Sequence, residues 1–306
     1  MNVPQVSVCV FSYNFGRYIA QALESVLQQK TGFDFEIVIG DDCSTDNTRA
    51  IVATFQQNHP GKIVLAYNDT NQGGTHNWIK TINACKGKYI ALLDGDDYFM
   101  DEYKLQQQFA LLENNASANI VFHSVKEIME NNNNREQDVV FPKDEYYTAD
   151  ILKQGWFMRT SSLFFRNGIL PVQPPEWVYL FPYRYDTILI IMLSINSKAI
   201  NCKKLMTVWR RHDAGLSYTI TKNYLQNYKN EKELYLHLQE ITGNRFNTAI
   251  GQYLKKIRTT VVFRSLKSLS FSNLTNLGFG KSINIDYGYF FSLMANAVKH
   301  KFKPAK

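Results

Sequence analysis

Short apolar runs and amphipathic segments alternate through residues 6–97 of the chain. The apolar runs are Val6–Phe11, Phe35–Gly40, Ile63–Tyr67 and Tyr89–Leu93. The segments between them have the apolar spacing of helices: Arg17–Gln29, Asn47–Asn58 and Thr75–Cys85. Because short connections join each run to the next segment, the pattern predicts right-handed βαβ units. The predicted fold class is therefore α/β, with a mostly parallel central sheet.

Beyond residue 97 the alternation becomes less regular. Ile120–Met129 and Gln137–Phe141 flank a run of asparagines, and this arrangement predicts a loose hairpin around a solvated loop. The other predicted elements are a helix, a strand, a helix and a strand: Asp101–Asn114, Thr160–Phe165, Tyr185–Asn196 and Leu205–Arg210.

The composition is that of an ordinary globular protein, with 306 residues, 45% hydrophobic and 20% charged. The N-terminus enters an apolar run almost at once, so we expect no secretory signal. No stretch reaches the roughly 18 apolar residues that a membrane span needs. The four cysteines are far apart in the sequence, which favours reduced thiols in the cytoplasm over disulfides or a zinc site: Cys9, Cys43, Cys85 and Cys202.

Positive charge is concentrated at the C-terminus. Residues 246–306 contain ten Lys/Arg and one acidic residue, a net charge of +9, whereas the preceding 245 residues carry 24 Lys/Arg and 26 Asp/Glu. This asymmetry indicates a boundary and a polyanionic partner. We expect one large domain over residues 1–220 and a basic helical region over residues 221–306.

Three carboxylates follow the apolar run that begins at Tyr89: Asp94, Asp96 and Asp97. At the carboxyl end of a buried parallel strand they would face the crevice where α/β sheets bind ligands. Carboxylates so close together repel one another, and a divalent cation that also holds a phosphate would relieve this repulsion. The alternative is an acidic turn that caps a helix starting at Tyr98.

The order of motifs resembles that of the family 2 glycosyltransferases, which are inverting, nucleotide-sugar-dependent enzymes with the GT-A fold. The resemblance covers residues 4–218 and implies a Rossmann-like nucleotide-sugar-binding domain. The matching segments, in chain order, are Val6–Asn14, Glu36–Thr48, Asn71–Gly74, Asn77, Gly87–Ile90 and Leu93–Asp97.

The resemblance implies a set of donor-binding residues that follow the predicted strands: Ser12, Tyr13, Asn14, Asp42, Asn71, Asn77 and Asp94. The ring of Tyr13 can stack on a nucleobase, although it could instead cover the core. The carboxylate of Asp42 matches the residue that recognises uracil in the family. A turn and a helix cap would explain Asn71 and Asn77 nearly as well. UDP-sugars are the expected donors, while dTDP and GDP donors also occur in the family.

The same resemblance implies the catalytic groups. Asp94 and Asp96 correspond to the DXD element, which holds Mg²⁺ or Mn²⁺ on the diphosphate, and Asp97 would serve the sugar or the outer coordination sphere. Asp186 matches the base that deprotonates the acceptor hydroxyl. The family's preceding glutamate is replaced by Tyr185 here, which leaves acceptor contacts in doubt. The alternative role of Asp186 is a helix cap.

Residues 208–217 resemble the family segment that folds over the nucleotide. Arg210 and His212 would meet the diphosphate or complete the metal coordination. A surface-exposed basic loop is the alternative. The resemblance therefore adds two donor-binding residues that lie far along the chain from the predicted sheet edge.

The basic C-terminal region contains an apolar helix face, formed by Ile250, Leu254, Ile257 and Val261. A second segment, Tyr287–Lys303, combines aromatic residues with lysines. Such helices suit an anionic membrane surface. Alternatively, their apolar faces pack on the catalytic domain or on a second copy in a homodimer. No nucleic-acid-binding motif accompanies the charge, so we expect no nucleic-acid partner.

Together these features predict a metal-dependent inverting glycosyltransferase, peripheral on the inner, cytoplasmic face of the cell membrane. It would transfer a hexose or N-acetylhexosamine from a UDP-sugar to a hydroxyl of a lipid-linked glycan in surface polysaccharide synthesis. One alternative is a sugar-phosphate nucleotidyltransferase, but Ser12–Arg17 lacks the glycine-rich basic loop that would bind a triphosphate. The other is a catalytically silent scaffold, against which the intact carboxylate set argues.

Overall fold

The computed structural model describes residues 3–130, 133–213, 215, 224–267 and 284–301, with side-chain surroundings given up to residue 295. Two compact units divide the chain. The first comprises residues 1–151 and 156–215, and the second comprises residues 152–155 and 216–306. The predicted boundary at residue 220 lies outside the described residues. Each unit is considered by itself.

A ten-stranded sheet forms the centre of the first unit. Its main strand order is β3-β2-β1-β4-β9-β6-β10-β5, with β7 paired to β6 and β8 paired to β10. The pairs within β3-β2-β1-β4 are parallel, as is β6-β10, and the remaining pairs are antiparallel. The strands are β1 Val6–Ser12, β2 Phe35–Asp41, β3 Ile63–Leu65, β4 Tyr89–Asp94, β5 Tyr98–Phe99, β6 Ala118–Met129, β7 Arg135–Val139, β8 Glu145–Tyr147, β9 Phe164–Arg166 and β10 Lys198–Arg211.

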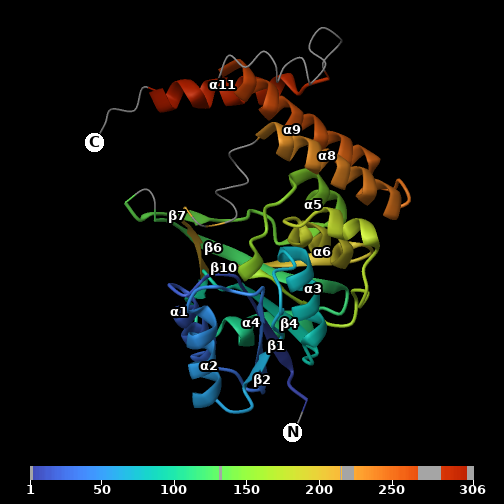
Figure 1. The fold of residues 1–306 in the computed structure, drawn as a ribbon. Coiled ribbons are helices and arrows are strands. Elements are labelled where there is room, and N and C mark those ends of the chain that lie inside the picture. Colours follow the sequence, from blue (N-terminus) through green and yellow to red (C-terminus); the bar gives the residue numbers. More distant parts are fainter. Residues whose placement is uncertain (1–2, 131–132, 214, 216–223, 268–283, 302–306) are drawn as a thin grey trace. The chain divides into compact units, whose positions relative to one another are not determined.

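Helices cover both faces of the sheet, with α1 and α2 on one side and α3 on the other (Figure 1). Alternate residues of β1, Val6, Val8 and Val10, join one apolar core with residues of α1, α2 and α4. On the other face α3 packs so closely on β2 that a Cβ at Gly40 would collide with Thr81. The helices are α1 Ile19–Leu27, α2 Thr48–Asn58, α3 Gly74–Ala84, α4 Lys104–Glu113, α5 Thr148–Gln154 and α6 Tyr185–Ser194, with two short 3₁₀ helices, η1 Thr160–Ser162 and η2 Glu176–Leu180.

The predicted α/β alternation is confirmed, and most element ends agree within a few residues. Two local predictions are wrong. One is the alternative of a helix capped by the acidic turn and starting at Tyr98: Tyr98–Phe99 form β5, paired with β10, and the predicted helix Asp101–Asn114 is α4, Lys104–Glu113. The predicted strand over residues 160–165 instead begins as η1, and only Phe164–Arg166 joins the sheet.

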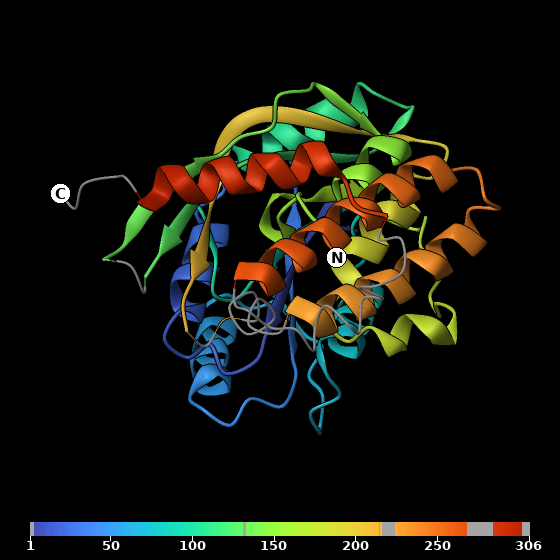
Figure 2. The same cartoon turned by 90° about the horizontal axis from the view of Figure 1, so that it is seen from above.

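The second unit contains three long helices: α8 Tyr224–Ile241, α9 Asn247–Lys267 and α11 Tyr287–Lys301. The helices α8 and α9 lie side by side (Figure 2). The rings of Tyr235 and Tyr253 stack at 4.3 Å, and the Tyr253 hydroxyl donates to Glu231 at 2.9 Å. A small apolar core that includes Val261 and Phe290 connects α9 to α11. In the described part of the chain, no helix combines the length and apolar character that crossing a bilayer requires.

Candidate active site

The carboxyl ends of β1, β2 and β4 meet at one edge of the sheet. In the parallel register, Phe11 of β1 lies between Gly40 of β2 and Asp94 of β4. The backbone N–H of Gly95 donates to the Phe11 carbonyl at 2.8 Å. A Cβ at Gly95 would lie 2.9 Å from that oxygen, so glycine allows the turn after β4 to approach β1 this closely. This edge gathers the segments that follow the three strands.

Four carboxylates from two distant parts of the chain form the carboxylate cluster: Asp94, Asp96, Asp97 and Asp186. Burial raises the pKa of Asp94, and the charges of Asp96 and Asp186 raise it further. Burial, followed by the charges of Asp96 and Asp94, raises the pKa of Asp97. The cluster thus concentrates negative charge in a partly desolvated place, where a cation would be strongly attracted.

His212 lies directly beside this cluster. Its Nε2 is 3.0 Å from Oδ2 of Asp96, and its side chain is almost fully buried. The imidazole ring packs against Tyr18, with ring centroids 4.7 Å apart, and meets the edge of Phe15. These aromatic contacts fix the orientation of His212 toward Asp96. The residue that follows β10 therefore contacts the turn after β4.

Arg210 supports the same turn from within the protein. Its backbone N–H donates to Oδ1 of Asp97 at 2.9 Å, and its guanidinium donates to the carbonyl of Asp96 and to Gln21. The guanidinium also lies 3.6 Å from Glu130, and the residue is only 9% exposed. These contacts commit Arg210 to holding residues 96 and 97 in place. Its contact with a diphosphate stays a prediction.

Asp97 has a different position from Asp94 and Asp96. It is 1% exposed, whereas the other two are half-buried. Its Oδ2 has no hydrogen-bond partner among the described residues. Asp97 is therefore enclosed by the protein, whereas Asp94 and Asp96 are the partly exposed carboxylates of this turn.

Asp186 is in the first turn of α6 and is half-buried. Its Oδ1 accepts the N–H of Thr187 at 2.6 Å, so the carboxylate also bonds the helix terminus. Burial raises its pKa, while the charge of Arg184 and the hydrogen bonds from Thr187 oppose this shift. A carboxylate with a raised pKa is a better proton acceptor than an ordinary one. Both the capping and the base interpretations are compatible with this geometry.

The segment after β1 contacts the segment after β2. Asn14 has a positive φ of 56°, donates its N–H to Ser44 and accepts the N–H of Thr45, both at 2.8 Å. Tyr13 is 43% exposed, so its ring is available to a ligand. The buried Oγ of Ser12 has no hydrogen-bond partner in the described part of the structure. Asn14 thus joins the loop that carries Tyr13 to the loop after β2.

The predicted residues around α3 are mostly engaged within the protein. Asp42 is buried and accepts the N–H groups of Gln72 and Gly73, each at 2.8 Å. Asn77 is buried and donates its amide to the Gly40 carbonyl at 3.1 Å, while Asn71 is exposed. Asp42 thus holds the loop that carries Asn71 against the sheet edge. Donor contacts by these three residues stay predictions.

Sequence reasoning missed Arg159, a cation close to the cluster. Its guanidinium lies between two indole rings, 4.1 Å from the centroid of Trp156 and 4.2 Å from that of Trp209. Burial lowers its pKa to about 10, an effect opposed by the charges of carboxylates that include Asp186 and Asp97. Its Nε has no acceptor among the described residues. In the sequence, the aromatic residues near Arg159 and Trp209 are the signal that could have indicated this position of the guanidinium between two rings.

Whether these residues suit a divalent metal depends on their donor atoms. Among the described residues, no group of three or more His, Cys, Asp or Glu side chains is arranged as a complete metal site. Mg²⁺ commonly uses one or two carboxylates together with substrate phosphates and water. Asp94 and Asp96 match that requirement, because they are half-buried, adjacent and mutually repelling. The site fits a metal that binds together with a diphosphate.

Several proteins are similar in sequence to part of this chain. An uncharacterized protein of Mycobacterium tuberculosis is 30% identical over 220 residues, which are 69% of this chain and 60% of that protein. An uncharacterized glycosyltransferase of Nostoc sp. is 33% identical over 184 residues, covering 56% of this chain and 55% of the relative. The chain thus spans less than two thirds of the length of these relatives.

Solved structures share the fold at low sequence identity. TarS of S. aureus, residues 1–349 in complex with UDP-GlcNAc, has a TM-score of 0.61 and 18% identity, over 88% of this chain and 74% of that one. A mannosyltransferase of Pyrobaculum calidifontis in complex with GDP-Man and Mn²⁺ has a TM-score of 0.59 and 14% identity, over 99% and 82%. The sheet and helices are those of a GT-A glycosyltransferase. The profile of glycosyl transferase family 2 matches residues 7–170, and the chain belongs to this family.

Proposed function

We propose that this protein is an inverting glycosyltransferase that transfers a sugar from a nucleotide-sugar to an acceptor hydroxyl. One observation carries the proposal: Asp186 and the Asp94–Asp97 turn are distant in sequence, yet the charge of Asp186 raises the pKa of Asp94. Sugar transfer with inversion needs a base on one side of the anomeric carbon and a site for the diphosphate on the opposite side. The carboxylate cluster supplies candidates for both.

In the proposed reaction, Asp186 accepts the proton of the acceptor hydroxyl while that oxygen attacks the anomeric carbon. The bond from this carbon to the diphosphate oxygen breaks, and the nucleoside diphosphate leaves from the opposite face. Asp186 suits this role because burial raises its pKa. The ring of Tyr13 would stack on the nucleobase, which its exposure permits.

Asp94 and Asp96 would hold Mg²⁺ or Mn²⁺, which when bound neutralises charge on the departing diphosphate. His212 would orient Asp96 through the contact at 3.0 Å. Arg210 and Asp97 would keep the turn rigid, because the Arg210 N–H and guanidinium contact both ends of the Asp96–Asp97 segment. The complex of the structurally similar mannosyltransferase with GDP-Man and Mn²⁺ supports this assignment.

We propose UDP-sugars as donors, since the structurally similar TarS forms a complex with UDP-GlcNAc and the family resemblance points to UDP. The acceptor would be a hydroxyl of a lipid-linked glycan at an anionic membrane surface. Support comes from α11, where Tyr287, Phe291 and Met294 are exposed and recur at helical spacing. An exposed aromatic stripe in a region of net positive charge is typical of helices that lie in a membrane interface.

The test is a donor panel. Purified protein is incubated with UDP-glucose, UDP-GlcNAc, GDP-mannose and dTDP-glucose, with Mn²⁺ or EDTA, and release of the nucleoside diphosphate is followed. We expect Mn²⁺-dependent release from a UDP-sugar and none in Asp96→Asn. Tight UDP binding without turnover, with or without glycan acceptors, would favour a silent scaffold. Release of triphosphate from a sugar-nucleotide with pyrophosphate would favour a nucleotidyltransferase.

A further inference from the structure

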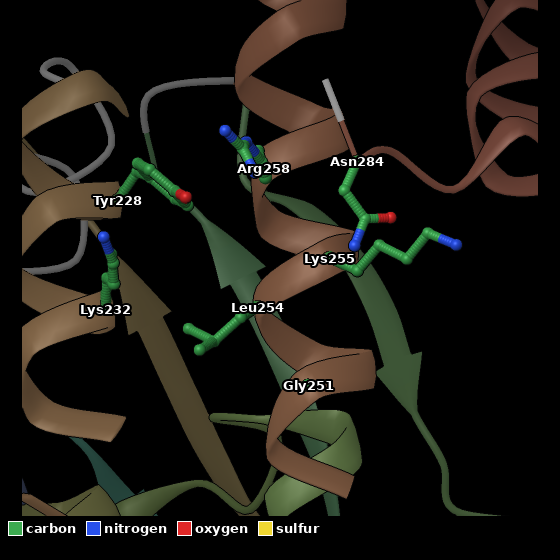
Figure 3. A pocket seen from close by; sticks show the side chains of 7 residues that line it. All are labelled: Tyr228, Lys232, Gly251, Leu254, Lys255, Arg258 and Asn284. Atoms are coloured by element: carbon green, nitrogen blue, oxygen red, sulfur yellow. The ribbon is translucent and has the colours of Figure 1, made fainter. Parts of the chain in front are cut away.

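A pocket of about 200 Å³ lies within the second unit, between α8 and α9. It is separate in sequence from all the residues of the carboxylate cluster. Figure 3 shows the side chains that line it. The lining residues are Tyr228, Lys232, Gly251, Leu254, Lys255, Arg258 and Asn284.

Helical spacing explains why these side chains meet. Tyr228 and Lys232 are four residues apart on α8 and therefore share one face, as do Leu254 and Arg258 on α9. In Figure 3, Tyr228 and Arg258 extend toward the space between the helices and Lys232 lies next to Tyr228. The ammonium of Lys255 points away from this space, so only its stem lines the wall.

The pocket combines positive charge with hydrogen-bond donors. Arg258 acts on Tyr228 closely enough to lower the pKa of its hydroxyl, against the larger effect of burial, which raises it. None of the described lining residues is acidic. The nearby buried carboxylate of Glu231 accepts the hydroxyl of Tyr253. Two cations and a phenol, Lys232, Arg258 and Tyr228, therefore line the cavity.

Gly251 lines the pocket, and the absence of a side chain at this position leaves space beside the helix. A Cβ built at Gly251 meets no atom within 4 Å, so the space beside it is open. Glycine inside a helix costs about 1 kcal/mol of stability relative to alanine. The helix pair thus keeps an unfavourable residue where a larger side chain would fill the pocket.

We propose that this pocket binds a phosphate group, either of a phospholipid headgroup or of a small free phosphoester. Lys232 and Arg258 would contact its charge and the Tyr228 hydroxyl would donate to one of its oxygens, a combination that suits phosphate oxygens. The volume holds a phosphate and the first atoms of its substituent. The site goes beyond the proposed sugar transfer, and its residues are distinct from those that would bind the donor.

The experiment uses the full chain and four variants. Inorganic phosphate and glycerol 1-phosphate are titrated by calorimetry into wild type, Lys232→Gln, Gly251→Leu and two controls. Lys229→Gln removes the same charge from an exposed position of α8 outside the pocket, and Gly251→Ala adds only a methyl group. Loss of one charge-assisted hydrogen bond corresponds to about a tenfold loss of affinity. We expect that loss in Lys232→Gln and Gly251→Leu, and little change in Lys229→Gln and Gly251→Ala.

The two possible sources of the phosphate group, a phospholipid headgroup and a small phosphoester, are distinguished by sedimentation with vesicles of phosphatidylglycerol or phosphatidylcholine. If pocket variants also lose binding to phosphatidylglycerol vesicles, the ligand is a lipid headgroup; if they lose only the soluble phosphates, it is a small phosphoester. Circular dichroism checks that Gly251→Leu is folded. No phosphate binding by the wild type, or equal losses in Lys232→Gln and Lys229→Gln, would overturn the proposal.

Discussion

In the carboxylate cluster, acidic side chains come from one tight turn and the start of one helix, and backbone hydrogen bonds hold the turn. In the pocket of the second unit, cationic side chains come from two helix faces, and long flexible stems carry their charges. The first arrangement partly buries like charges and raises the pKa values of Asp94 and Asp97. The second leaves Lys232 exposed. We infer that the cluster is built for chemistry at fixed positions and the pocket for attraction of an anion.

The largest effect is expected for Asp186→Asn, which removes the proposed base from the cluster and keeps its shape. General-base catalysis contributes about 10²- to 10⁴-fold in rate, so kcat for transfer should fall by about that factor. Affinity for the nucleotide should stay unchanged, because Asp186 would contact the acceptor. Steady-state kinetics with binding calorimetry measures both quantities. A full loss of nucleotide binding would instead assign Asp186 to the donor site.

The pH dependence of the same reaction provides an independent test. Because burial raises the pKa of Asp186, its protonation occurs above the ordinary aspartate value of about 3.9. As the pH falls through this raised pKa, the base takes up a proton and kcat/KM should decline. The acidic limb should be absent from the residual activity of Asp186→Asn. An unchanged limb in that variant would mean that another group controls it.

A smaller effect is expected for His212→Ala. The imidazole orients Asp96, and loss of such a supporting contact typically costs about 10- to 100-fold in metal affinity. The Mn²⁺ concentration that half-saturates activity should rise by that factor, while kcat at saturating Mn²⁺ changes less. Lys229→Gln in the second unit is the matched control and should leave both values unchanged. Equal losses in kcat and in Mn²⁺ affinity would give His212 a direct role in transfer.

The smallest effect concerns stability and contrasts a buried cation with an exposed one. Burial lowers the pKa of Lys104 in the first unit to about 7 from 10.5. Between these values the unfolded chain binds more protons than the folded one, so stability rises with pH. The free-energy cost of burying the charged Lys104 ammonium is fully present below pH 7 and disappears above about pH 10.5. Lys104→Met should remove up to about 1.4 kcal/mol per pH unit of this slope.

Urea unfolding at pH 7, 8 and 9 measures this slope. The matched variant Lys232→Met changes a lysine that is exposed on α8, and its slope should equal that of the wild type. Equal slopes in the wild type and Lys104→Met would show that Lys104 titrates normally in the folded state. The proposed difference between a buried and an exposed lysine in the pH dependence of stability would then be contradicted.

Much of the fold follows from local sequence patterns, whereas the roles of single residues do not. Apolar runs and helical spacing predict β1 to β4 and their helices, because each of these elements is a continuous segment with its own hydrophobic period. The alternative of a helix starting at Tyr98 is wrong because β10, more than 100 residues later, pairs with β5.

The site shows the same limit. Asp94 and Asp96 could be expected at the sheet edge because they follow an apolar run, whereas Asp186 is identified only through the resemblance to the family. The contacts of Asp42 and Arg210 could not be expected, because their partners lie in other segments: Gln72, Gly73, Gln21 and Glu130. The position of Arg159 between Trp156 and Trp209 likewise depends on tertiary packing.

The central claim is that the half-buried carboxylates Asp94 and Asp96 bind a metal together with a nucleoside diphosphate. Calorimetry with UDP, with and without Mn²⁺, tests it most directly in the wild type and in Asp96→Asn. We predict that UDP binds the wild type only when Mn²⁺ is present, and that Asp96→Asn abolishes this binding while its fold and thermal stability are kept. UDP binding that is equally tight without Mn²⁺, or that survives in Asp96→Asn, would contradict the account.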